Sequence, residues 1–178
     1  MRPAFSVVIF TTLTGAGQGL FLVIYLADLM VGGHLLSPTF VAVGAATAGG
    51  LSTIGLLASF FHLGHPERAW RAAAMWRTSW LSREVIVLPL FIASCEFYAA
   101  ARFLGWPGAE WIGAVGFLAC VALFICTAMI YICLRFLQEW ASLLTLSNFV
   151  LLGAASGCTL AVPIAHGLAP GVSGAMAM

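Results

Sequence analysis

Five apolar runs, each long enough to cross a lipid bilayer, dominate this sequence of 178 residues. An α-helix needs about 20 predominantly apolar residues to cross the hydrocarbon layer. Only 7% of the residues are charged, against roughly a quarter in soluble domains. The pattern predicts an all-α, polytopic transmembrane helix bundle, with residues 1–178 as one domain. The expected spans are roughly Ala4 to Val31, Thr39 to Phe61, Arg83 to Leu104, Trp111 to Leu134, and Leu143 to His166.

The residues between and within the runs support this bundle. Gly-Pro-rich turns separate the runs, and all six tryptophans lie in or next to predicted connections, as in an interfacial aromatic belt. Small residues recur at four-residue spacing, which lets helices approach closely in a membrane. These small-residue pairs are Gly15/Gly19, Gly44/Ala48 and Gly153/Gly157.

The segment Phe61–Val85 is the polar exception, since it contains four of the seven arginines. Pro66 is suited to start a short helix, and Glu67 stands four residues before Arg71 as a helical ion pair. Residues 62–83 are therefore expected to form an amphipathic loop at the membrane interface. Ser82 is expected to cap the third span, which would put Glu84 in its first turn.

The arginines also predict the orientation of the bundle. Five spans put Arg2, the four arginines of the loop and Arg135 on one side, and Arg102 alone near the other. Such a six-to-one bias in short loops marks the cytoplasmic face. The N-terminus and the 62–83 loop are expected to be cytoplasmic, although arginines kept for docking a protein would produce the same asymmetry.

Charge and cysteine content exclude some functions. A net charge of +1 with locally placed arginines provides no surface for DNA or RNA. The five cysteines fall inside predicted spans without metal-ligand spacing, so they are expected to be packing residues, and no metal site is predicted in this chain.

His62 and Glu84 form the candidate catalytic pair. Either residue alone is most simply a polar group at the end of a span. Together, an imidazole and a carboxylate at one membrane depth suit a quinone, whose reduction requires two protons and whose oxygens need hydrogen-bond partners. Inside the membrane, Arg102 is expected to form a structural salt bridge with either Asp28 or Glu96, with a proton route through these acids as the alternative.

Two sequence motifs resemble a known family. The strings "HLGHPERAW" and "WRTSWLSREV", with a weaker similarity in "VIFTTLTGAGQG", resemble the membrane-anchor subunit of dimethyl-sulfoxide-reductase-type molybdopterin complexes. Within that family, the charged loop looks most like the anchors of membrane-bound sulfite-oxidising (sulfite dehydrogenase) complexes. Family members usually have eight spans, against about five here.

The resemblance implies a role in anaerobic or sulfur respiration in the bacterial inner membrane. Such an anchor docks an iron–sulfur subunit beside a molybdopterin catalytic subunit and exchanges electrons with ubiquinone or menaquinone. It would be a subunit of an oxidoreductase rather than the molybdenum subunit, and its quinol-site histidine and essential acid fall on His62 and Glu84. The remaining quinone-pocket candidates are Trp80, Ser82 and Arg83, and the partner-docking candidates are Glu67, Arg68, Arg71 and Arg77.

Three alternatives remain at this point. The chain could be the quinol-oxidising anchor of a reductase. It could be a haem b anchor, for which only His34 and His166 come near the required geometry, so haem is disfavoured. A transporter coupled through Asp28 and Glu96 would normally show internal repeats or broken helices, and the sequence has neither.

Overall fold

The structure of the chain is a computed structural model that describes residues 5–30, 36–61, 65–134 and 138–168. The described residues form five long α-helices and one 3₁₀ helix, without a β-strand. All five α-helices are long and apolar enough to span a membrane, which confirms the predicted all-α, five-span architecture. The elements are α1 (Phe5–Met30), α2 (Pro38–Phe60), η1 (Pro66–Met75), α3 (Trp80–Phe103), α4 (Ala109–Ile132) and α5 (Leu144–Leu168).

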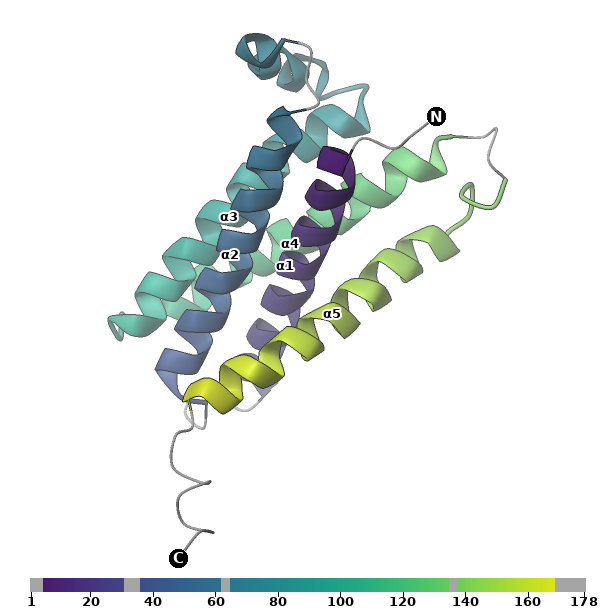
Figure 1. Cartoon of the computed structure of the whole chain (residues 1–178). Helices are drawn as coiled ribbons and strands as arrows, with labels where there is room; N and C mark the ends of the chain where they lie inside the picture. The colour runs from purple at the N-terminus through teal and green to yellow at the C-terminus, as the bar shows by residue number, and fades with distance from the viewer. Residues whose placement is uncertain (1–4, 31–35, 62–64, 135–137, 169–178) are drawn as a thin grey trace, which may run out of the picture.

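The order of packing differs from the order along the chain (Figure 1). Helix α1 packs against α2, α2 against α3, and α3 against α4. Helix α5 instead packs mainly along α1 and contacts α4 much less. The short helix η1 lies beyond the ends of α2 and α3, at the end of the bundle where α1 begins (Figure 1). The core between α1, α3 and α4 is aromatic, with Phe21 in edge contact with Phe91 and Tyr98.

Helix α3 begins earlier than the sequence predicts. Its N-cap is Ser79, whose backbone is extended and whose hydroxyl accepts a hydrogen bond from the Ser82 backbone N–H at 3.4 Å. The prediction that Ser82 caps the helix was wrong, because Ser82 already has a helical position. Glu84 consequently lies one turn inside the helix instead of in its first turn.

The predicted pair between Glu67 and Arg71 is replaced by other contacts. Glu67 lies 3.0 Å from the His65 ring nitrogen Nδ1 and 3.9 Å from the Arg68 Nε, and the Arg71 guanidinium lies over the Trp70 ring. The reason is the 3₁₀ geometry, because three residues per turn align positions i and i+3 but not i and i+4.

Most residues of the predicted small-residue pairs lie at close helix contacts, and Gly15 is the exception because a β-carbon there meets nothing within 4 Å. A β-carbon built on Gly19 of α1 would overlap the backbone carbonyl of Gly153 in α5, and one built on Gly157 would overlap the backbone of Gly19. In α2, one built on Gly44 would meet Ile24, and Ala48 faces Gly17. Helices α1 and α5 therefore touch backbone to backbone, and only glycine fits at their crossing.

We expect Gly19→Ala to destabilise the bundle by about 1–3 kcal/mol, since the added methyl group meets backbone that cannot rotate away. Gly15→Ala is the matched control in the same helix, because a β-carbon there meets nothing within 4 Å. Alanine also favours the helix by about 1 kcal/mol relative to glycine, so Gly15→Ala should not lose stability. Thermal unfolding in one detergent should separate the two variants. Equal melting temperatures would contradict the close α1–α5 crossing.

A buried ion pair joins α1 and α3 at the end of the bundle that is far from η1. Arg102 Nη2 donates to Asp28 Oδ1 at 2.7 Å, and the Tyr98 hydroxyl donates to Asp28 Oδ2 at 2.5 Å. This confirms the predicted salt bridge and identifies Asp28 as the acid in it. Glu96 is exposed, and its carboxylate lies against Gly49 of α2.

Candidate functional site

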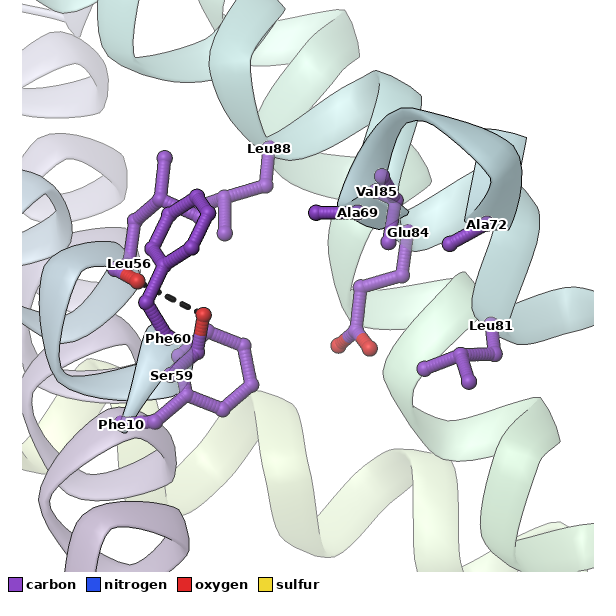
Figure 2. Close-up of a pocket in the computed structure, with 10 residues that line it drawn as sticks. All are labelled: Phe10, Leu56, Ser59, Phe60, Ala69, Ala72, Leu81, Glu84, Val85 and Leu88. Carbon is purple, nitrogen blue, oxygen red and sulfur yellow. Dashed lines mark hydrogen bonds between the residues drawn. The ribbon is translucent and has the colours of Figure 1, made fainter. Parts of the chain in front are cut away.

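A cavity of about 280 Å³ lies at the η1 end of the bundle, between α1, α2, η1 and α3. Its wall is apolar except for Ser59 and Glu84 (Figure 2). Residues of α1 and of the three consecutive elements α2, η1 and α3 therefore line one chamber. Its lining residues are Phe10, Leu56, Ser59, Phe60, Ala69, Ala72, Leu81, Glu84, Val85 and Leu88.

Glu84 is the only charged residue on this wall among those described. It lies on the face of α3 that also carries Leu81 and Leu88, and it is only 6% exposed. The Thr127 hydroxyl of α4 donates a hydrogen bond to its Oε1 at 2.6 Å. Figure 2 shows the carboxylate pointing into the chamber. Thr127 therefore holds one oxygen of a carboxylate that points into the chamber.

The 3₁₀ helix η1 forms the roof of the chamber. Ala69 and Ala72 line it, and their spacing of three residues places both on one side of a 3₁₀ helix. Arg83 ties the end of this roof to α3, because its Nε donates to the Trp76 carbonyl at 2.9 Å and its Nη2 to the Arg77 carbonyl at 3.0 Å. The Arg83 guanidinium also stacks over the Trp80 ring at 4.1 Å.

The outer side of η1 is charged and aromatic. Arg68, Arg71 and Trp70 are exposed there, and the guanidinium groups of Arg71 and Arg77 lie over the rings of Trp70 and Trp76. The roof thus has an apolar inner side and an outer side that carries arginine and tryptophan side chains.

Comparison with known proteins decides the family. The profile of the DMSO reductase anchor subunit (DmsC) matches residues 1–170 of the chain. The chain belongs to the DMSO reductase anchor family. It is also 53% identical to a sulfite dehydrogenase subunit of Allochromatium vinosum, over 90% of this chain and 54% of that protein. The chain thus spans about half the length of this relative. No solved structure matches.

The predicted pocket residues of this anchor fall into two groups. Glu84 lines the chamber, whereas Trp80, Ser82 and Arg83 are not among the residues that line it. Trp80 and Arg83 stack on each other, and Ser82 is buried. His62 lies outside the described residues, as does His34. Phe60, two residues before His62 in the sequence, is part of the wall.

The docking candidates of the anchor lie on its surface. Glu67, Arg68, Arg71 and Arg77 are all exposed, in or next to η1. Among the described residues, no cluster of histidine, cysteine or acidic side chains could hold a metal ion. The cysteines are unpaired, and three of the five are buried.

Sequence reasoning missed the residues that other helices bring to the site. Thr127 lies within the apolar run of α4, where a hydroxyl commonly bonds to the carbonyl one turn earlier, as Ser52 and Ser94 do here. Ser59 carries no motif, and Phe10 lies in the string "VIFTTLTGAGQG", which resembles the family but gave no role to this side chain. The contribution of these residues depends on which helix faces meet, and hydropathy gives no information about that.

Proposed function

We propose that this anchor binds the head of a quinone in the Glu84 chamber and links it to an iron–sulfur partner docked on η1. The observation that carries the proposal is the buried Glu84 carboxylate, held by Thr127 and turned into an apolar chamber at one end of the bundle. The family match supports this role, because an anchor in a redox complex has its partners at the membrane surface.

The chamber fits a quinone head by size and chemistry. Its volume of about 280 Å³ is close to the lower end of the range of roughly 300–1,000 Å³ for small-molecule sites. Aromatic and aliphatic walls from Phe10, Phe60 and Leu88 suit a planar ring, and Glu84 and Ser59 can serve polar atoms at its edge. A bound quinone would supply two-electron chemistry coupled to two protons.

The residues of the chain have separate tasks in this proposal. The Glu84 carboxyl accepts a proton from, or donates one to, the quinone oxygen next to it. Thr127 fixes the orientation of this carboxyl, and the alanines of η1 exclude water from above. His62 is proposed as the second hydrogen-bonding group, because it follows the last turn of α2, of which Ser59 and Phe60 line the chamber.

The physiological reaction we propose is cytoplasmic sulfite oxidation by a molybdopterin partner, with electrons passing through iron–sulfur clusters to quinone in the bacterial inner membrane. Two observations support it: the named relative belongs to a sulfite dehydrogenase, and six of seven arginines belong to the expected cytoplasmic side. A quinol-oxidising reductase anchor is the second candidate, favoured by the family name itself. Sulfite-dependent quinone reduction by the purified complex would decide between them.

We expect His62→Gln to weaken the binding of a quinone-analogue inhibitor by roughly 5- to 150-fold, the effect of one lost hydrogen bond of about 1–3 kcal/mol. His65→Gln is the matched control, since His65 is exposed and paired with Glu67. Inhibitor titration of quinone-linked turnover measures both. Equal losses from the two substitutions, or none from either, would place the quinone elsewhere.

We expect replacement of both Arg68 and Arg71 by glutamine to weaken docking of the iron–sulfur partner roughly two- to thirtyfold, because exposed charge pairs each contribute about 0.2–1 kcal/mol. The double lysine variant keeps the charge and should dock nearly as well as the original. Co-purification of the whole complex at rising salt concentration is the measurement. Unchanged salt sensitivity in the glutamine variant would argue against η1 as the docking surface.

A further inference from the structure

A second cavity, of about 420 Å³, lies where α4 ends and α5 begins. It shares none of its described lining residues with the Glu84 chamber. Three aromatic rings and three polar side chains surround it, together with one leucine. The lining residues are Tyr131, Glu139, Trp140, Thr145, Asn148, Phe149 and Leu152.

The three aromatic rings form one connected cluster. The centroids of Tyr131 and Trp140 are 5.2 Å apart with the rings nearly perpendicular, and those of Tyr131 and Phe149 are 5.5 Å apart. The Thr145 hydroxyl donates to the Trp140 carbonyl at 2.8 Å, which fixes the connection to the start of α5. The three rings thus pack against one another and together line this cavity.

The described lining of this cavity, with aromatic rings and one carboxylate, is suited to a cation. Aromatic faces attract ammonium groups, most strongly where several rings surround them. Glu139 adds a carboxylate, and none of the described lining residues is basic. The tryptophans of the η1 region differ, because Trp70, Trp76 and Trp80 each stack with an arginine of the chain.

The position of the cavity points to a membrane lipid as the source of that cation. It lies at the ends of two spans, where headgroups are found. Leu151 and Leu152 of α5 are 65% and 69% exposed, so an apolar surface leads from the cavity along the helix toward the hydrocarbon layer. We propose that this cavity binds the ammonium headgroup of a phospholipid, with its acyl chains along α5.

The test is lipid binding to the delipidated full chain by native mass spectrometry. The probes are phosphatidylethanolamine, its N-acetylated form, which lacks the positive charge, and phosphatidylglycerol, all with the same acyl chains. We expect phosphatidylethanolamine to bind about tenfold more tightly than the other two, as a cation–π contact with an adjacent carboxylate would give. Equal affinity for all three lipids would overturn the proposal.

Substitutions locate the site. Glu139→Gln and Trp140→Leu should each abolish most of the preference for the amine lipid, and Glu139 is exposed, so its substitution leaves the fold intact. Trp111→Leu is the control, since Trp111 is 78% exposed at the other end of the bundle. Retained preference in Glu139→Gln would place the lipid elsewhere. Free phosphoethanolamine binding as tightly as the lipid would show that the ligand is a soluble amine and overturn the lipid assignment.

Discussion

Glu84→Gln is expected to lower quinone-linked turnover by about two orders of magnitude or more, the usual effect of removing a general acid or base. Glutamine keeps the size of the side chain and can still accept a hydrogen bond from Thr127, but it cannot exchange a proton. The measurement is steady-state reduction of a short-chain quinone by the purified complex. The reaction of the catalytic partner with an artificial dye, which bypasses the anchor, should remain normal.

Glu96→Gln is the matched control for this substitution. Glu96 is on the same helix, about three turns away, and is exposed and absent from the chamber wall. Its substitution should leave quinone turnover close to that of the original protein. A Glu84→Gln complex that reduces quinone at the normal rate would remove Glu84 as the proton carrier, even if quinone binds in the chamber.

Arg102→Leu is expected to destabilise the protein by about 3–5 kcal/mol, because it leaves the Asp28 carboxylate buried without its cation. Asp28 is 4% exposed, and the Arg102 guanidinium is 2.7 Å from it. Tyr98 alone would remain as the described donor to this carboxylate. Unfolding by SDS titration in mixed micelles measures the change, and quinone binding at the opposite end of the bundle should be unaffected in the folded fraction.

The double variant Asp28→Leu with Arg102→Leu distinguishes a lost ion pair from lost packing. Replacing both partners by apolar residues of similar volume is often neutral, since neither charge is then buried alone. We expect the double variant to recover most of the stability that the single variant loses. If it is at least as unstable as Arg102→Leu, the arginine stabilises the fold through packing rather than through charge.

Hydropathy predicted the five spans and placed every span end within three residues of the helix end, with the largest difference at the start of α3. The expected third span started at Arg83 because the charges and the polar residues before it lower the local average, whereas the helix begins at Trp80 behind the Ser79 cap. The loop was expected to carry a helix from Pro66, and a helix does begin there. Its 3₁₀ form could not be predicted from spacing, and this form changed the partners of Glu67.

The ion pair between Asp28 and Arg102 could be predicted only in part from residue types. An acid and an arginine near the same end of an apolar bundle have to be neutralised, so a salt bridge with Arg102 was predictable. The choice of Asp28 over Glu96 was not, because it depends on the rotation of α1 and α3. That rotation directs Asp28 toward Tyr98 and Arg102, and leaves Glu96 on the outer surface beside Gly49.

The sequence by itself determined the class of protein, the number of spans in this chain, the polar segment at one end and Glu84 as its candidate acid. These are properties of single residues and of short windows, since apolar content, charge and turn residues act locally. The tertiary structure decided the chamber, which needs Phe10, Ser59, Ala69 and Glu84 from four segments. It also brought Thr127 to Glu84 across 43 positions of sequence. Such contacts depend on which helix faces meet, and that is set by close crossings such as the one at Gly19, where backbone meets backbone.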